Sequence, residues 1–155
     1  MAIYIKYDTF VADLCGKVHD ILGTTPTSDC DALKIMLSDT VADIGVTKAT
    51  RSQITEIANG NGYATGGLPA SGGLNSGAAA SGTFTLTGTN QVWTSSGAGM
   101  AEFQYVILYN DTPTSPADPL IGCWNYGTPL TLAVGETFTV KFNNGATTGT
   151  ILTLA

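Results

Sequence analysis

EFQYVILYNDTPTSPADPLIGCWNYG, which runs from Glu102 to Gly127, is the stretch around which we expect the rest of the chain to fold. It concentrates the bulky side chains of the sequence. In its first half, aromatic and aliphatic residues alternate with a mixture of polar and aliphatic ones, which predicts a strand buried on at least one side. One face would carry Phe103, Tyr105, Ile107 and Tyr109, and the other Gln104, Val106, Leu108 and Asn110.

The segment from Asn110 to Pro119 ends this strand. Its three prolines cannot donate to a strand ladder, and its two aspartates favour turns. We expect a second strand to return beside the first through a loop of about ten residues, so that a long hairpin lies at the centre of a β-rich domain. The apolar run of this second strand contains Leu120, Ile121, Trp124 and Tyr126.

Composition favours a single all-β domain. The chain has 155 residues, which suits one domain with an ordinary core. Only 12% of the residues are charged and 19 are glycine, a balance typical of β proteins with hydroxyl-rich surfaces and short turns. We therefore treat residues 1–155 as one domain, with an N-terminal arm and helix over residues 1–23 and a β-rich core over residues 32–155.

Short strands are also predicted on both sides of the hairpin. Each shows an apolar run or an apolar–polar alternation, and turn sequences such as SSGAG and NNG separate several of them. The fold we expect is mainly β, a β-sandwich or jelly-roll with one N-terminal α-helix. These further strands cover residues 32–37, 83–87, 91–94, 137–142 and 150–154.

One helix is predicted near the N-terminus. From Asp8 to Leu22, apolar residues recur every three or four positions, the spacing of a helix with one apolar face. Asp8 is the expected N-cap and Gly23 the expected end, although Gly16 in the middle costs about 1 kcal/mol relative to alanine. The apolar face would carry Phe10, Val11, Leu14, Val18, Ile21 and Leu22.

Two segments carry weaker signals. Residues 41–58 fit either a helix or irregular cover over the core. Residues 59–82, NGNGYATGGLPASGGLNSGAAASG, are rich in small residues and predict a surface loop or an extended strand. A phosphate-binding loop is disfavoured, because no Gly-Lys-Ser/Thr sequence follows these glycines and the net charge is negative.

Charge and hydropathy argue against two classes of partner. Twelve acidic residues against six basic ones give a formal net charge of −6, which repels phosphates and disfavours nucleic acid as a partner. The sequence has no run of 18 apolar residues, and its first residues lack the apolar core of a signal peptide. We therefore expect no membrane partner and a chain that is made and kept in a cytoplasm.

The three cysteines predict no disulfide. Cys15, Cys30 and Cys123 show no CxxC spacing, and any single pairing leaves one of them over. We expect all three to stay reduced and to fill small apolar sites.

The titratable residues show no catalytic or metal-binding pattern. His19 is the only histidine, and we interpret it as a surface side chain. Asp29 and Asp31 lack the other ligands of a calcium loop, so we expect them to cap the turn before the strand that begins at Ala32.

The sequence favours neither a glycosidase site nor a sugar-binding site. Glu102, Asp111 and Asp118 are poor candidates for paired acids, because two of them fall in a proline-rich loop where rigid placement is hard. No Gly-x-Ser-x-Gly motif occurs, and we expect no enzymatic activity, no cofactor and no metal. Large aromatics that could stack on a sugar ring are more often core residues in a sandwich of this size, and here they are Trp93, Trp124 and Tyr126.

Five motifs follow one another along the chain. They are ITEIANGNGYATGG from Ile54 to Gly67, WTSSG from Trp93 to Gly97, EFQYVILYNDT, PLIGCWNYG and LAVGETFTVKF. Together they resemble small virion proteins of tailed bacteriophages, which are often described as capsid decoration or other structural proteins. The resemblance extends from the helix at Asp8 to Ala155.

This resemblance implies a capsid decoration, or cement, protein. Such a protein would bind the major capsid protein on the outside of the assembled head, in a virion made in the cytoplasm of a bacterial host. It would act as a homo-oligomer, and a trimer is favoured because shells offer threefold positions. The alternatives are a tail or tail-tip component and a carbohydrate-binding module.

The apolar arm before the helix is the expected contact surface. Ile3, Tyr4, Ile5 and Tyr7 need a partner, which is either the chain's own core or a neighbouring subunit. We assign these four residues to contact with a neighbour or with the shell. We therefore expect deletion of residues 1–7 to leave the β-domain folded and to weaken assembly.

Overall fold

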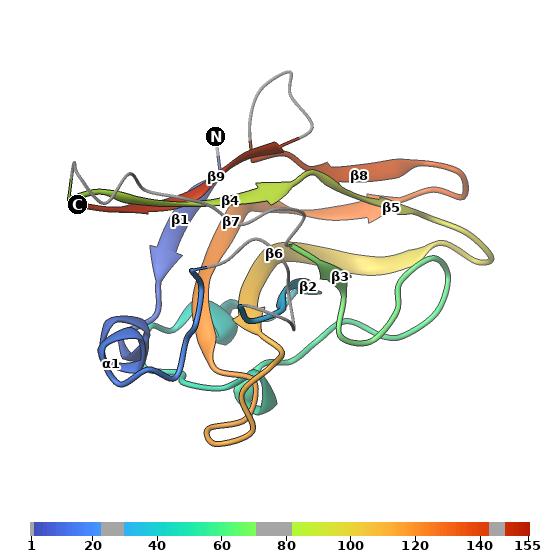
Figure 1. Ribbon diagram of the computed structural model, residues 1–155. Coiled ribbons are helices and arrows are strands. Elements are labelled where there is room, and N and C mark those ends of the chain that lie inside the picture. The colour runs from blue at the N-terminus through green and yellow to red at the C-terminus, as the bar shows by residue number, and fades with distance from the viewer. Residues whose placement is uncertain (1, 23–29, 71–81, 143–147) are drawn as a thin grey trace.

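The structure is a computed structural model that describes residues 2–22, 30–70, 82–142 and 148–155. Figure 1 shows two antiparallel β layers, of which one is a five-stranded sheet and the other a narrow two-stranded ribbon above it. One α-helix lies at the end of the sheet (Figure 1). The predicted mainly β fold with one N-terminal α-helix is thus confirmed, in a β-sandwich-like arrangement.

The five-stranded sheet contains the predicted central hairpin. The two hairpin strands, β6 and β7, pair antiparallel at its centre, in the order β1-β7-β6-β2-β3. The connecting loop runs from 111 to 119, close to the predicted length. The strands of this sheet are β1 (Ile3–Lys6), β2 (Leu33–Ser38), β3 (Leu68–Pro69), β6 (Met100–Asn110) and β7 (Leu120–Leu132).

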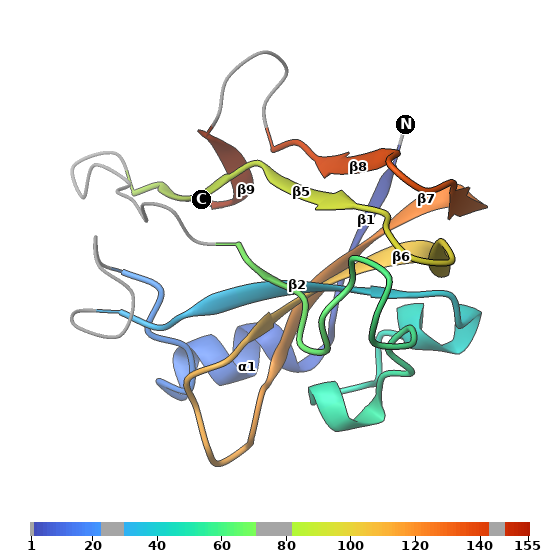
Figure 2. The same ribbon diagram turned by 90° about the vertical axis from the view of Figure 1, so that its right-hand side faces the viewer.

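The ribbon is built from two strand pairs placed end to end. Only Asn90 separates β4 from β5, so the two pairs form one long ribbon that crosses over the sheet (Figure 2). Its residues match the strands predicted in the last third of the chain. The pairs are β4 (Phe84–Thr89) with β9 (Thr148–Leu154), and β5 (Gln91–Thr94) with β8 (Thr137–Val140).

Each face of the five-stranded sheet packs against its own core. Odd-numbered residues from Tyr105 to Tyr109 join an outer core, on the face away from the ribbon. Val106 and Leu108 join a ribbon-side core. The predicted alternation fails at Phe103, which belongs to the ribbon-side core because the pairing of β6 with β7 shifts register between Phe103 and Tyr105.

The helix is shorter than the sequence predicts. Helix α1 covers Thr9–Cys15 and ends at Gly16, so the apolar spacing that continues to Leu22 is not helical. Lys17 takes a left-handed conformation with φ 61°, which ends the helix. Asp8 occupies the N-cap position, but its side chain makes no capping hydrogen bond. The predicted end at Gly23 lies outside the described residues.

The ambiguous segment between residues 41 and 58 is irregular cover with two short 3-10 turns. These turns are η1 (Val41–Ile44) and η2 (Arg51–Gln53). Ile44 and Ile54 pack against the outer core and so cover the face of the sheet that the ribbon leaves open. This cover and the ribbon together bury both faces of the central hairpin.

Candidate functional site

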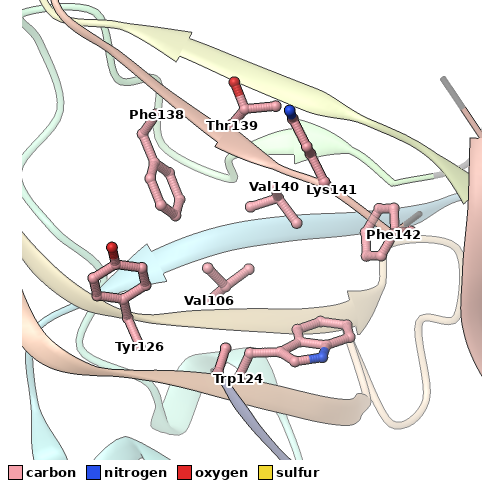
Figure 3. A pocket seen from close by; sticks show the side chains of 9 residues that line it. Val106, Trp124, Tyr126, Phe138, Thr139, Val140, Lys141 and Phe142 are labelled. Atoms are coloured by element: carbon pink, nitrogen blue, oxygen red, sulfur yellow. The ribbon is translucent and has the colours of Figure 1, made fainter. Parts of the chain in front are cut away.

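An aromatic cleft opens between β8 of the ribbon and the face of β7 that is turned toward the ribbon. It has a volume of about 280 Å³, and its lining is mostly apolar. Figure 3 shows rings from both layers pointing into it, with Val106 on its floor. The residues that line this aromatic cleft are Ala2, Val106, Trp124, Tyr126, Phe138, Thr139, Val140, Lys141 and Phe142.

Strand alternation places these side chains. On β7, Trp124 and Tyr126 are two residues apart and therefore point to the same face, toward the ribbon (Figure 3). On β8 and just beyond it, Phe138, Val140 and Phe142 point down toward them, while Thr139 and Lys141 point the other way (Figure 3). The two layers thus present facing aromatic rows.

Ring contacts hold one side of the cleft together. The Trp124 ring lies 5.8 Å from the Phe142 ring and 5.3 Å from the Tyr4 ring, measured between centroids. Tyr4 comes from β1, whose register sets it opposite Trp124. Contacts of this kind contribute about 0.5–1.5 kcal/mol each beyond the area that they bury. The N-terminal strand is therefore part of the wall that supports the cleft.

The cleft offers a mostly apolar interior. Burial raises the pKa of Tyr4, whose ring contacts Trp124, to about 12, and Cys123 adds to that rise. Lys141 is exposed, and its side chain points away from the facing rings (Figure 3). Half of the Tyr126 side chain, 51%, is exposed to solvent. Such a surface suits binding of an apolar or aromatic partner better than proton transfer.

The three aromatics weighed for sugar binding take different positions. Trp93 is 2% exposed and stacks near Phe138, so the core interpretation is right for it. Trp124 is partly buried in the wall of the cleft. The core interpretation is wrong for Tyr126, because β7 extends past the edge of the ribbon-side core and carries this ring out to the solvent.

His19 is a buried side chain, and its interpretation as a surface residue is wrong. It is 4% exposed, and its ring lies 5.4 Å from the Phe10 ring. The chain turns back after Gly16, which brings His19 under the end of β6, where its Nδ1 lies 3.1 Å from Asn110 Nδ2. A helix that continued to Leu22 would have left His19 exposed to solvent, so the wrong interpretation of His19 follows from the wrong helix length.

Asp31 does not cap the turn before β2. Its carboxylate accepts hydrogen bonds from the backbone N–H of Asp20 at 2.7 Å and from the side-chain amide of Asn110 at 2.6 Å. It therefore joins the segment after the helix to the end of β6. Asp29 lies outside the described residues.

The structure separates Glu102 from the other two acids considered for a glycosidase pair, Asp111 and Asp118, which both lie in the hairpin loop and are each engaged in an ion pair. Glu102 lies near one end of β6 and Asp111 just beyond the other end, which places them about 30 Å apart at about 3.3 Å per residue. Paired acids of glycosidases lie within about 10 Å of each other. Asp111 pairs with Lys34 at 2.7 Å and Asp118 with Arg51 at 3.5 Å. These carboxylates hold the hairpin loop to its surroundings.

Sequence reasoning missed a network around Glu56. Its carboxylate accepts hydrogen bonds from the Tyr63 hydroxyl at 2.7 Å and the Gly66 N–H at 2.5 Å, and it pairs with Arg51 at 3.0 Å. Part of the glycine-rich segment is therefore packed and is not a simple surface loop. A Cβ on Gly67 would lie 1.9 Å from the Ile35 carbonyl oxygen, which only glycine avoids.

The cysteines divide between surface and core. Cys30 and Cys123 are buried among apolar residues, as expected. Cys15 is exposed, which corrects the expectation for this residue, because the last turn of α1 turns it away from the core. All three cysteines carry thiols in the structure.

The arm pairs with its own sheet. Strand β1 runs antiparallel to β7, and Tyr7 is fully buried and donates a hydrogen bond to the Asp43 carbonyl oxygen at 2.5 Å. Tyr7 is therefore a core residue of its own chain, which corrects its assignment as a partner contact. Ile3, at 65% exposure, and Tyr4, at 38%, remain accessible, whereas Ile5 packs partly against the outer core.

Within the described ranges, no three His, Cys, Asp or Glu side chains gather closely enough to hold a metal ion. The same residues include no helix that is both long and apolar enough to cross a membrane. No family model, no curated protein and no solved structure matches this chain.

Proposed function

We propose that this chain is a structural protein of a bacteriophage virion, without enzymatic activity, which decorates the outside of the assembled head and binds the major capsid protein. The observation that carries the proposal is the aromatic cleft, a ready-made apolar binding surface at an open side of a β-sandwich-like fold. The five motifs that resemble small virion proteins, in their order along the chain, are our reason for proposing a phage virion as the assembly.

The carboxylates support a structural role. Asp43, Glu56, Asp111 and Asp118 each bind a cation or backbone N–H groups and so fix loops to the sheet or to one another. Groups engaged in this way stabilise the native fold. Their placement therefore suits a protein that presents a rigid surface.

The charge balance favours the exterior of the head. The formal net charge of −6 would repel packaged DNA on an inner face. On the outer face the same charge carries no such cost.

The test is binding to shells assembled from the major capsid protein of the same phage. The Tyr126→Ala variant removes an exposed ring from the cleft and should weaken cosedimentation with these shells at least tenfold, a loss typical of a central aromatic contact. Val92→Ala is the matched control, because Val92 is half exposed on the ribbon outside the cleft. Equal binding of Tyr126→Ala and the wild type would refute this use of the cleft.

A carbohydrate-binding module is the second candidate. Trp124 and Tyr126 lie side by side on β7 with accessible faces in a cleft large enough for a sugar ring (Figure 3). Binding on a glycan array that disappears in Trp124→Ala, together with no binding to shells, would favour this candidate over the virion protein.

A further inference from the structure

His19 occupies a junction between three parts of the chain. It follows α1 and lies 4% exposed against Phe10 on one side and the end of β6 on the other. Next to it, Asp20 and Asp31 exchange hydrogen bonds, from the Asp20 N–H to the Asp31 carboxylate and from the Asp31 N–H to the Asp20 carbonyl. Residues 17–22 are therefore held to the sheet through a small set of polar contacts.

The hydrogen bonds assign the tautomer of His19. The Asn110 amide nitrogen donates to Asp31 Oδ2 at 2.6 Å, and the Asn110 amide oxygen accepts from the Thr112 N–H at 3.2 Å. The amide orientation is thus fixed, and the nitrogen that faces His19 Nδ1 is a donor. Nδ1 must accept, so the proton of the neutral ring lies on Nε2, which is buried without a hydrogen-bond partner.

A second proton on this ring would conflict with its surroundings. Protonated Nδ1 would face the donor nitrogen of Asn110, and turning that amide would break its bonds to Asp31 and Thr112. A mostly apolar hollow of about 270 Å³ borders the ring. Its lining consists of Leu14, His19, Asp20, Ile21, Leu22, Phe84 and Leu154.

At His19, burial lowers the pKa by more than the carboxylates around the ring raise it. Burial lowers the pKa of His19 below its ordinary value, while Asp13 on α1 and Asp31 before β2 raise it in part. Asp20 neighbours His19 in sequence, and on the β6 side the nearest charges along the chain are the paired Asp111 and Lys34. The neutral ring is therefore the form that the fold holds.

We propose that His19, Asn110 and Asp31 form an acid-sensitive latch, which holds residues 17–22 on the end of the sheet at neutral pH and releases them when His19 is protonated. Release would expose Phe10 and Ile21, both part of the ribbon-side core. Because the unfolded chain takes up the proton more readily than the folded one, stability is present above a pH of about 6.5 and is lost as the pH falls below it.

The first test is the titration of His19 in the wild-type protein by NMR. The chain has one histidine, so its ring signals need no assignment by mutation. The latch predicts a midpoint clearly below pH 6.5. A midpoint at or above about 6.5, the value of an ordinary histidine, would overturn the proposal.

The second test is hydrogen exchange of the backbone amides at about pH 7.5 and about pH 5. After correction for intrinsic rates, the protection of residues 17–22 should fall at least tenfold on acidification, while that of Ile107 in the centre of β6 stays unchanged. In His19→Asn, whose amide oxygen can accept from Asn110 but cannot titrate, the loss should disappear. If this variant does not fold, the wild-type exchange decides: equal protection of residues 17–22 at both pH values would refute the latch.

Discussion

Asp43 is the residue whose contacts most clearly show how buried polar groups hold this fold. Its side chain is fully buried, and Oδ2 accepts hydrogen bonds from the Ser38 hydroxyl at 2.6 Å and the Thr55 N–H at 2.8 Å. Oδ1 has no hydrogen bond but lies 3.3 Å from Lys48 Nζ, which makes it half of an ion pair. One carboxylate thus fixes the cover segment to β2.

Asp43→Ala should lower the free energy of unfolding by about 3–5 kcal/mol, because it leaves Lys48, Ser38 and Thr55 without their shared partner. Urea unfolding measures the change. The matched control is Asp39→Ala, at an exposed position between β2 and η1, which should change stability by less than about 0.5 kcal/mol. A similar small effect at position 43 would mean that the carboxylate does not support the cover.

The three thiols should differ in reactivity. Burial raises the pKa of Cys123 to about 11, with a smaller contribution from Asp43, so this group is a protonated, inaccessible thiol at pH 8. Cys30 is also buried, whereas Cys15 is exposed. An alkylating reagent followed by mass spectrometry should label Cys15 in the native protein and all three cysteines in denaturant. Rapid native labelling of Cys123 would contradict its placement.

Among the elements, strand β1 changes what we expect from deletion of the N-terminal arm, because it pairs with β7. The sequence led us to expect that residues 1–7 could be deleted without unfolding the β-domain. Because β1 pairs with β7 and Tyr7 is fully buried, deletion should cost at least about 3–5 kcal/mol, a large part of the stability of an ordinary domain.

Denaturant unfolding of the truncated chain checks this expectation. The control is Lys6→Ala, which changes an exposed side chain on the same strand outside the proposed contact residues and should leave stability within about 0.5 kcal/mol of the wild type. A truncated chain as stable as the full one would show that β1 only lies on the surface. Reduced shell binding by Ile3→Ser would support the proposed role of the arm as a contact.

Some of these elements could be predicted from the amino-acid sequence and others could not. The hairpin of β6 and β7 was predictable because alternation and prolines are local signals. The end of α1 was not, because apolar spacing continued through Gly16 while tertiary contacts turned the chain back. The cleft was predictable only as separate rows of aromatics. That the rows of β7 and β8 face each other depends on how two distant layers pack.

At the scale of the whole molecule, we propose a homotrimer. Strand β1 lies at the edge of the five-stranded sheet and carries the exposed Ile3 and Tyr4, a surface that favours burial against another chain. Light scattering coupled to size exclusion should give three times the chain mass of 15.9 kDa at micromolar concentration. The same measurement on Ile3→Ser should show partial dissociation, and a wild-type mass of one chain would refute the trimer.

The central claim is that this protein decorates the outside of a phage head, and its location in the particle tests that claim most directly. Antibodies against the purified protein can be applied to intact, purified virions of the phage that encodes it, and the bound gold particles viewed by electron microscopy. We predict gold distributed over the whole head surface, in many copies per particle. Gold confined to the tail, or virions without any label, would contradict the proposed function.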